Sequence, residues 1–311
     1  MFNFRFGRGL ATAEKSYDFP PFRPPSEAES LLLRMTRGCP WNRCAFCPMY
    51  RGIRFEVRES EAVRRDIDTA KEVLNEPVET VFVGDSDSLV ANTHTWCDIL
   101  ASLYEAFPSI TRVTTYARAY TLKRRSLEGL KKIRRAGLTR LHIGLETGNA
   151  LVLKKVRKGA TPATMIQGCH QAKEAGFEVS VYVLVGIGGR SLWREHALET
   201  ASVLNAIEPD FIRVRTLIPQ PGTALYRWWK AGTFELPAPE LALKEQRVLI
   251  ESLKVNAYYL SDHVSNYAPV HGRLPGNRSD MLKVIQDITD RLRGDENFRQ
   301  CIKKRSKHIY L

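Results

Sequence analysis

Three cysteines, Cys39, Cys44 and Cys47, lie within nine residues of one another near the start of the chain. Thiolates are the usual protein ligands of iron–sulfur clusters. No fourth cysteine lies nearby, so a cubane cluster held by these three would keep one iron open to a substrate or cofactor. The spacing therefore predicts a [4Fe–4S] cluster that takes part in chemistry.

A zinc site completed by a histidine is the alternative for this loop. His94, His142 or His196 would have to reach it from elsewhere in the fold, and structural zinc sites usually join two short Cys/His hooks rather than one. The other cysteines are scattered, which argues against a disulfide scaffold. Cys97 and Cys169 fall on apolar faces of predicted helices, so we expect both in the core.

Short apolar strands alternate with longer helices from residue 31 onward. Strands are predicted at 31–36, 79–83, 111–117, 139–144, 178–185 and 211–217, and helices at 59–75, 93–106, 126–136, 162–175 and 190–206. Six strand–helix units with nearly continuous apolar strands predict an α/β fold with a parallel sheet and right-handed crossovers. We expect a partial (β/α)6 TIM-like barrel, although a doubly wound open sheet fits the same alternation. Both folds place the site at the C-terminal ends of the strands, where the cysteine loop begins.

Two of the predicted helices carry boundary signals. Ser126 is the expected N-cap of one helix, and Gly137 ends it. Thr161 caps another helix, with Pro162 at its first position and Gly176 at its end.

Composition and termini predict a globular cytoplasmic protein. No apolar run approaches the roughly 18 residues that a membrane span requires, and the N-terminus does not resemble a secretory signal. We expect three parts: a proline-rich N-terminal arm over 1–30, the barrel over 31–230, and a C-terminal helical and irregular extension over 231–311 that covers the substrate.

The net charge of +13 is concentrated locally. Between residues 119 and 145 a single acid, Glu128, accompanies eight basic residues: Lys123, Arg124, Arg125, Lys131, Lys132, Arg134, Arg135 and Arg140. Such stripes bind phosphate backbones, but they are also common on solvated helix faces. RNA therefore stays open as a partner.

Three further segments sharpen the interpretation of the cysteine loop: Thr115–Arg118, Leu141–Gly148 and Pro221–Thr223. With the loop and the α/β alternation, they resemble the radical S-adenosylmethionine (radical SAM) superfamily. The likeness covers roughly residues 30–230 and is greatest to the branch with oxygen-independent coproporphyrinogen oxidases, methylthiotransferases and the Elongator catalytic subunit. The superfamily's usual spacing is Cys-x3-Cys-x2-Cys, whereas four residues separate Cys39 from Cys44 here.

The resemblance implies an oxidoreductase that uses a [4Fe–4S] cluster and S-adenosylmethionine. Such an enzyme cleaves the cofactor reductively to a 5′-deoxyadenosyl radical, which abstracts hydrogen from a substrate. It would need an electron donor such as flavodoxin or ferredoxin. We expect a small-molecule substrate, because the short chain leaves little room for an RNA-binding domain. An RNA-modifying enzyme is one alternative, and an iron–sulfur electron-transfer or sensor protein that does not cleave the cofactor is another.

The resemblance also assigns residues to the cofactor. Phe46 matches the aromatic position beside the adenine, Gly84 and Asp85 with Ser86 match the site of its amino group, and Glu146 matches the residue that bonds the ribose hydroxyls. Further candidates for cofactor contacts or the cavity wall are Tyr116, Arg118, Arg157, Tyr182, Arg213 and Arg215. Arg213 and Arg215 alternate along one strand and so share a face.

The segment 261–273 is polar and carries two histidines, unlike a plain linker. Because C-terminal additions in the superfamily commonly shape the substrate pocket, we hypothesise that four of its residues face the substrate: His263, Asn266, Tyr267 and Arg273. An ordered surface loop is the alternative.

Overall fold

The computed structural model describes residues 22–308, with side chains described up to residue 302, so most of the predicted N-terminal arm lies outside the described residues. The chain divides into two compact units. The first contains the chain up to Asn42, Tyr50–His142 and His170–Glu178, and the second contains Arg43–Met49, Ile143–Cys169 and the chain from Val179 onward. The predicted boundaries at residues 30 and 230 stay predictions.

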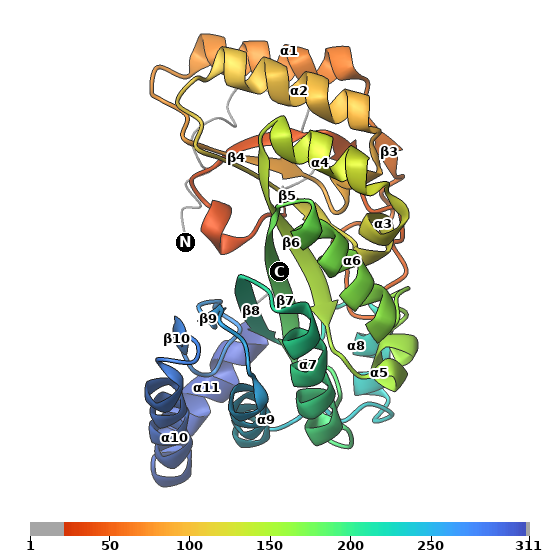
Figure 1. The fold of residues 1–311 in the computed structure, drawn as a ribbon. Helices are drawn as coiled ribbons and strands as arrows, with labels where there is room; N and C mark the ends of the chain where they lie inside the picture. The colour runs from red at the N-terminus through yellow and green to blue at the C-terminus, as the bar shows by residue number, and fades with distance from the viewer. Residues whose placement is uncertain (1–21, 309–311) are drawn as a thin grey trace. The chain divides into compact units, whose positions relative to one another are not determined.

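The first unit is built on parallel strands that follow the order β1-β4-β5-β6 (Figure 1). These strands are β1 (Leu31–Arg34), β4 (Thr80–Gly84), β5 (Arg112–Ala117) and the first part of β6 (Leu138–Glu146). In register, Leu31 lies opposite Val81, which lies opposite Val113. The helices α1 (Ser60–Val73), α2 (Thr93–Ala106) and α4 (Leu127–Arg135) lie along one side of these strands, as Figure 1 shows.

Short elements connect these strands and helices. They are the 3₁₀ turns η1 (Pro25–Glu27) and η2 (Ser88–Val90), helix α3 (Ala119–Arg124), and the antiparallel pair β2 (Thr36–Arg37) and β3 (Glu56–Val57). The predicted strand 31–36 is therefore interrupted at Met35, where the chain leaves β1 to form β2.

The second unit continues from β6 in the order β7-β8-β9-β10. These strands are β7 (Glu178–Val185), β8 (Phe211–Thr216), β9 (Tyr258–Leu260) and β10 (His271–Arg273). β9 is parallel to β8, and β10 closes the order as an antiparallel edge. The C-terminal extension, predicted as helical and irregular, therefore also supplies two strands.

The second unit contains most of the helices. Their bounds are α5 (Ala150–Lys155), α6 (Pro162–Glu174), α7 (Trp193–Ile207), α8 (Ala224–Lys230), α9 (Pro239–Ser252), α10 (Arg278–Gly294) and α11 (Glu296–His308). The end of α6 belongs to the first unit. No described helix combines the length and the apolar composition needed to cross a bilayer.

The predicted helix boundaries are confirmed. Ser126 Oγ accepts a hydrogen bond from Gly129 N at 3.1 Å, and Thr161 Oγ1 accepts one from Thr164 N at 3.2 Å. Gly137 has φ +121°, and a Cβ there would lie 2.1 Å from the Tyr104 ring, so only glycine fits this turn.

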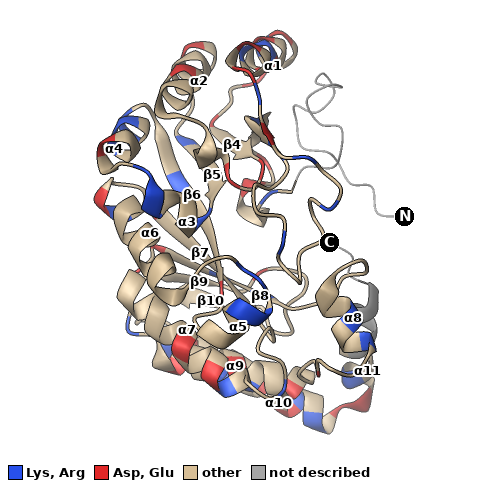
Figure 2. Ribbon diagram, turned by 90° about the vertical axis from the view of Figure 1, so that its right-hand side faces the viewer, with Lys and Arg blue, Asp and Glu red and all other residues tan. Residues whose placement is uncertain are grey.

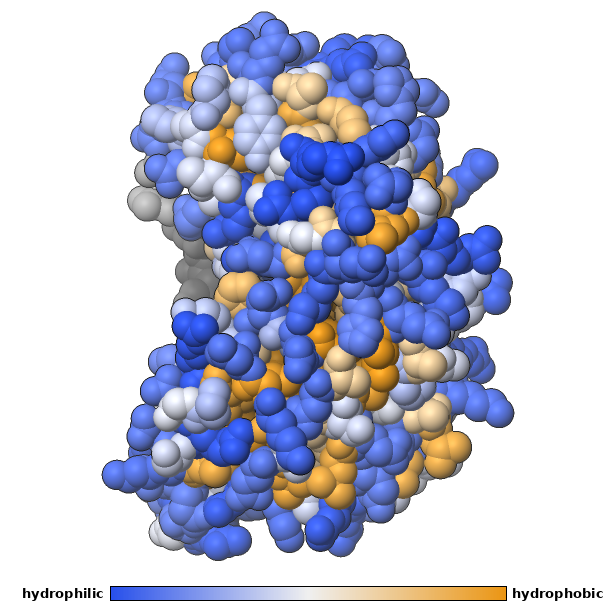
Figure 3. Space-filling view, viewed as in Figure 1, coloured by the Kyte–Doolittle hydropathy of each residue, from blue (hydrophilic) through white to orange (hydrophobic). Residues whose placement is uncertain are grey.

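Apolar strand residues form the core, as expected for parallel strands covered on both faces. Val81, Val113 and Leu141 are completely buried. Cys169 is buried as predicted, whereas the prediction for Cys97 was wrong, because this residue is only half-buried. On the face drawn in Figure 3, hydrophobic residues form separate patches surrounded by hydrophilic residues.

Candidate cluster and cofactor site

The start of the cysteine loop is held by the residues that follow β4. Gly38 N donates a hydrogen bond to Asp85 Oδ2 at 2.8 Å, and Ser86 Oγ donates one to Gly38 O at 3.0 Å. Arg34 Nε lies 3.6 Å from the same Asp85 oxygen, and both side chains are buried. Asp85 and Ser86, predicted to contact the cofactor, thus bond the backbone beside Cys39.

Asn42 shapes the interval between the first two cysteines. It has φ +45°, a left-handed conformation that asparagine tolerates better than most residues. Its N–H lies 3.3 Å from Cys39 Sγ, and its side chain donates to Tyr50 O at 2.6 Å. These two hydrogen bonds fix the turn between Cys39 and Cys44.

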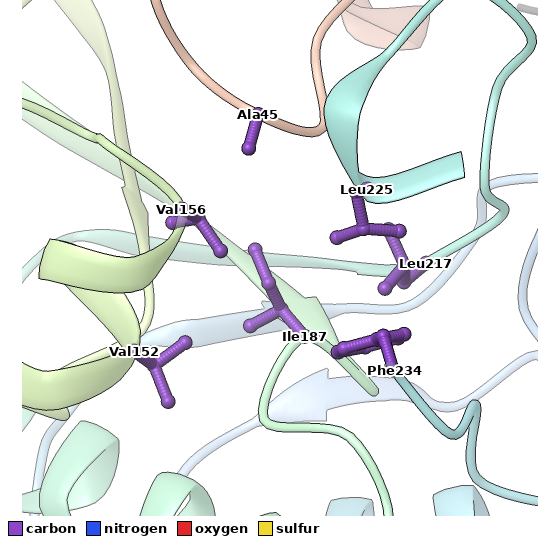
Figure 4. Close-up of a cluster of buried hydrophobic side chains, with 7 residues drawn as sticks. All are labelled: Ala45, Val152, Val156, Ile187, Leu217, Leu225 and Phe234. Carbon is purple, nitrogen blue, oxygen red and sulfur yellow. The ribbon is translucent and has the colours of Figure 1, made fainter. Parts of the chain in front are cut away.

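The second and third cysteines flank a residue that is fixed in the second unit through its backbone. Ala45 N donates to Val156 O at the end of α5, and Leu225 N at the start of α8 donates to Ala45 O, both at 2.8 Å. The Ala45 side chain belongs to a buried apolar cluster that Figure 4 shows, formed by Ala45, Val152, Val156, Ile187, Leu217, Leu225 and Phe234. The backbone of Ala45, which lies between Cys44 and Cys47, therefore anchors this part of the loop.

Phe46 is half-buried against this cluster and lies beside a charged pair. Lys158 Nζ is 5.8 Å from the centre of the Phe46 ring and donates to Glu146 Oε1 at 2.7 Å. A Cβ at Gly144 would lie 2.4 Å from that Glu146 oxygen and 2.7 Å from Lys158 Nζ, so glycine leaves room for the pair. The structure thus brings together Phe46 and Glu146, two residues that the sequence assigned to the cofactor.

Lys158 is the cation that pairs with Glu146, whereas a contact of Arg157 with the cofactor stays a prediction. Arg157 has φ +55° and an exposed side chain. The basic run 154–158 gave the signal, but the sequence could not show which residue of the run turns toward Glu146.

Arg118 is held in the first unit at the start of α3. Its N–H donates to Asp87 Oδ1 at 3.1 Å, and its guanidinium lies 5.2 Å from the centre of the Trp41 ring. Thr121 Oγ1 donates to the other Asp87 oxygen at 2.5 Å. Burial of Asp87 raises the pKa of this carboxyl to about 6. Tyr116 packs edge-on against Phe82, with ring centres 5.2 Å apart.

Arg213, Arg215 and Tyr182 come together, as predicted for one face of neighbouring strands. Tyr182 lies opposite Arg213 in the β7–β8 register, and Arg215 lies 5.2 Å from the centre of the Tyr182 ring. Arg213 is buried and donates from Nε to Ser180 Oγ at 3.2 Å.

Asn266 joins the C-terminal segment to the end of β8. Its amide donates to Val214 O at 2.7 Å and accepts from Thr216 Oγ1 at 3.1 Å, and the residue is buried. Ser265 Oγ also accepts from Thr216 N, at 3.2 Å. Asn266 therefore supports the segment against the strand.

His263 contacts Ser265 of the same segment, with its Nδ1 2.8 Å from Ser265 Oγ. Burial and the nearby Arg215 lower the pKa of His263 to about 4, so its imidazole is neutral at pH 7. Tyr267 is half-buried, and burial raises the pKa of its hydroxyl. Arg273 is exposed on the edge strand β10, where its guanidinium lies 5.5 Å from the centre of the Tyr258 ring. These four candidate substrate residues thus fall in different environments.

A buried polar network links α9 to the loops after β6 and β7, and the sequence did not reveal it. Glu245 Oε1 accepts from Gly186 N at 2.7 Å and lies 3.1 Å from His196 Nε2. The other ring nitrogen of His196 lies 2.7 Å from Thr147 Oγ1, next to Glu146. The sequence signal for this network was a histidine, His196, and an acid, Glu245, each on an otherwise apolar face of its helix.

The chemistry of the cysteine loop fits an iron–sulfur cluster better than zinc. Cys39, Cys44 and Cys47 are all half-buried. Within residues 22–302, no three Cys, His, Asp or Glu side chains form a ready-made metal-binding group, and this holds for the three cysteines as well. The histidines considered for zinc are engaged or exposed: His196 binds Glu245, and His142 Nε2 lies 3.3 Å from Glu27.

Comparison with known proteins decides the family. The model of the radical SAM superfamily matches residues 33–201, more than half of the chain. The chain belongs to the radical SAM superfamily. It is therefore a radical SAM enzyme whose cofactors are a [4Fe–4S] cluster and S-adenosylmethionine, and enzymes of this superfamily need a reductant.

Curated relatives fall in the branch that the sequence predicted. The heme chaperone HemW of Bacillus subtilis is 28% identical over 145 residues, which cover 46% of this chain and 37% of HemW. Human Elongator complex protein 3 is 29% identical over 104 residues, covering 33% of this chain and 19% of that protein. The chain thus spans less than half the length of either relative.

Solved structures confirm the fold. Coproporphyrinogen III oxidase (HemN) from Escherichia coli aligns with a TM-score of 0.57 at 19% identity, covering 71% of this chain and 51% of that one. Elp3 of Methanocaldococcus infernus aligns with a TM-score of 0.51 at 15% identity, covering 75% and 58%. The expected partial TIM-like barrel, rather than a doubly wound sheet, is therefore the fold.

Proposed function

We propose that this radical SAM enzyme holds its cluster through Cys39, Cys44 and Cys47 and abstracts a hydrogen atom from a small-molecule substrate. When bound, the cofactors supply reductive cleavage of S-adenosylmethionine to a 5′-deoxyadenosyl radical. Flavodoxin or ferredoxin would supply the electron. A reducing compartment such as the cytoplasm suits an oxygen-labile cluster.

The arrangement around Ala45 carries this proposal. Two backbone hydrogen bonds fix the residue between Cys44 and Cys47, and the next residue, Phe46, lies beside the Lys158–Glu146 pair. Two of the three proposed cluster ligands, an aromatic surface and a hydroxyl acceptor thus come from one connected part of the second unit.

The side chains of this part have distinct proposed roles. Phe46 provides a flat apolar surface for the adenine, and Glu146 accepts hydrogen bonds from the ribose hydroxyls. Lys158 orients the Glu146 side chain through a charge-assisted hydrogen bond. Arg213 and Arg215 offer positive charge to a carboxylate of the substrate or cofactor.

In the first unit, the proposed contribution is positional. Asp85 and Ser86 fix the backbone of Gly38, immediately before the ligand Cys39. Gly84 carries the chain from β4 into this pair, and Asp87 holds the backbone of Arg118.

Residues 231–311 form the proposed substrate cover. His263 is the substrate candidate with the best support, because it is partly buried, uncharged at neutral pH and within the electrostatic influence of Arg215. A neutral imidazole can both donate and accept a hydrogen bond with a substrate.

A small molecule is favoured over RNA because three cations of the basic stripe at 123–140, namely Arg125, Arg134 and Arg140, bond protein oxygens. Arg125 donates to the backbone oxygens of Leu89 and Ala91 at 2.6 and 2.7 Å, and Arg140 pairs with Glu178 at 2.9 Å. RNA is the second candidate, because Elongator complex protein 3 and archaeal proteins named tRNA uridine(34) acetyltransferase are similar to this chain. Tight binding of transfer RNA with a steep salt dependence would favour that candidate.

The test is anaerobic reconstitution with iron and sulfide, reduction with dithionite, addition of S-adenosylmethionine, and quantification of 5′-deoxyadenosine. We expect product from the wild type and from the matched control Cys301→Ala, which alters an exposed cysteine. Cys44→Ala should lose the product and the visible absorption of the cluster. Another outcome is a reducible cluster whose spectrum S-adenosylmethionine does not change, with no cleavage of S-adenosylmethionine. This outcome would instead favour an electron-transfer or sensor protein.

A further inference from the structure

Three segments of the second unit meet at Ala45 and share an unusual composition. They are the cysteine segment 43–49, the α5 segment 150–161 and the α8 segment 221–234. Together they contain seven basic residues and no acidic one: Arg43, Lys154, Lys155, Arg157, Lys158, Arg227 and Lys230. We use the name α5–α8 surface for five exposed residues of these two helices: Lys154 and Lys155 of α5, and Arg227, Trp229 and Lys230 of α8.

The cations of the α5–α8 surface project into solvent. Lys154, Lys155, Arg227 and Lys230 are all exposed. Among the side chains of residues 22–302, none of these four has a carboxylate within ion-pair distance. Figure 2 shows the corresponding basic segments of α5 and α8.

Aromatic rings accompany these charges on α8. Tyr226 and Trp229 form an edge-on pair with ring centres 5.6 Å apart, and Lys230 Nζ lies 4.9 Å from the centre of the Trp229 ring. Trp229 is 37% exposed although it is among the largest apolar side chains. Exposed tryptophan with neighbouring cations is typical of protein-binding surfaces, where Trp, Tyr and Arg contribute most of the binding energy.

The α5–α8 surface is also directly connected to the cluster ligands. Val156 at the end of α5 and Leu225 on α8 each share a backbone hydrogen bond with Ala45, which lies between Cys44 and Cys47. Val152, Val156, Leu225 and Phe234 pack in one buried cluster beneath the surface (Figure 4). A partner bound here would therefore face the polypeptide that carries two of the three proposed ligands.

We propose that the α5–α8 surface docks an acidic one-electron-donor protein of the flavodoxin type. The inference rests on the proposed function, which requires one electron to pass from the reduced flavin to the oxidised cluster for each cleavage. The flavin is oxidised by one electron, and the cluster is reduced by one. Complementary charge steers such encounters and raises their rate, and small interfaces suffice for transient electron transfer.

A polynucleotide fits this surface less well than a protein. Single-stranded nucleic acids need a series of exposed rings on which successive bases stack. Tyr226 is half-buried and already packs against Trp229, so the surface offers one well-exposed ring.

The test compares two fourfold charge reversals in the full chain. The first is Lys154→Glu, Lys155→Glu, Arg227→Glu and Lys230→Glu. The matched control reverses four exposed cations of the first unit: Lys123→Glu, Arg124→Glu, Lys132→Glu and Arg135→Glu. Circular dichroism checks the fold of both, and the neutral set Lys154→Gln, Lys155→Gln, Arg227→Gln and Lys230→Gln replaces the first if it does not fold.

Two readouts separate this proposal from the proposed function. Calorimetric titration with oxidised flavodoxin measures docking directly, and 5′-deoxyadenosine formation is followed with either reduced flavodoxin or dithionite. For the first variant we expect flavodoxin binding and flavodoxin-driven turnover to fall by about tenfold or more, as steering by several charges implies. Dithionite-driven turnover should stay within about twofold of wild type, because a small reductant needs no docking surface.

Equal flavodoxin binding by both variants would overturn the proposal. So would loss of transfer RNA binding in the first variant without any change in flavodoxin binding, because this would identify the surface as an RNA site. Absence of 5′-deoxyadenosine from wild type with dithionite would instead refute the proposed function, while the titration would still report on docking.

Discussion

In two basic regions of the described chain, lysine and arginine residues have different roles. The basic stripe at 123–140 in the first unit was conspicuous in the sequence, yet Arg125, Arg134 and Arg140 bond protein oxygens there. On the α5–α8 surface of the second unit, Lys154 and Lys230 carry their charge into solvent. Figure 2 shows basic residues in both regions.

This difference teaches that the density of basic residues does not by itself identify a binding surface. An arginine that donates to backbone carbonyls stabilises the fold, and its charge is less available to a partner. A lysine with no acidic neighbour contributes little to stability but dominates the local potential. Substitutions in the two regions should therefore separate stability from binding.

The largest effect on stability is expected from Arg125→Ala. This change removes three hydrogen bonds from a charged donor, to Leu89 O, Ala91 O and Thr93 Oγ1. At about 1.5 kcal/mol or slightly less for each bond, the free energy of unfolding should fall by about 4 kcal/mol. Arg227→Ala on α8 is the matched control and should change it by less than about 0.5 kcal/mol. Urea denaturation measures both, and equal losses would contradict the distinction between the two regions.

The next effect concerns Asp87, the buried acid near Arg118 and Arg125. Burial raises its pKa from 3.8 to about 6, so the folded state binds the proton more tightly than the unfolded state. This contribution to stability is complete below pH 3.8 and is lost as the pH rises through about 6. It amounts to about 3 kcal/mol for a shift of this size.

Asp87→Asn should remove this pH dependence. Urea denaturation of the cluster-free protein between about pH 4.5 and 7.5 should show the stability of the wild type falling relative to the variant across this window. Parallel curves for the two proteins would mean that the buried carboxyl titrates normally.

The smallest effect is expected from Arg140→Ala. The Arg140–Glu178 pair is 2.9 Å long, but the Glu178 side chain is 47% exposed. Loss of this ion pair should lower the free energy of unfolding by about 0.5 to 1 kcal/mol, as is typical of solvent-accessible pairs, and high salt should reduce this difference. A thermal shift assay at low and high salt measures this. If Arg140→Ala lowered the stability as much as Arg125→Ala, solvent exposure would not predict how much each cation of the stripe contributes to stability.

The alternation of apolar strands and amphipathic helices was enough to predict six strands and their helices. Parallel strands buried on both faces leave a continuous apolar signal, and helices such as α4 carry a cap residue at one end and a glycine at the other. β9 and β10 left no such signal, because each has three residues and depends on pairing, first with β8 and then with each other. Short strands of this kind are decided by tertiary contacts.

Site residues were predictable from the sequence where their position is set by nearby residues of the chain, such as a cysteine of the loop or the end of a strand. Phe46 follows Cys44 by two residues, and Glu146 ends a strand, so both were within reach of sequence reasoning. The choice of Lys158 over Arg157 depends on a left-handed turn at Arg157, which the sequence does not signal. The His196–Glu245 contact joins α7 to α9 across almost fifty residues, and only folding brings them together.

The anchoring of Ala45 has a consequence for how this loop can vary in length. Its two hydrogen bonds use backbone atoms only, and they lie between Cys44 and Cys47. An insertion in that interval would shift a residue out of register with α5 and α8 and break both bonds. The interval from Cys39 to Cys44 lies outside the anchor, and Asn42 turns within it in a left-handed conformation. Natural or engineered changes in cysteine spacing should therefore be tolerated in the first interval and rejected in the second.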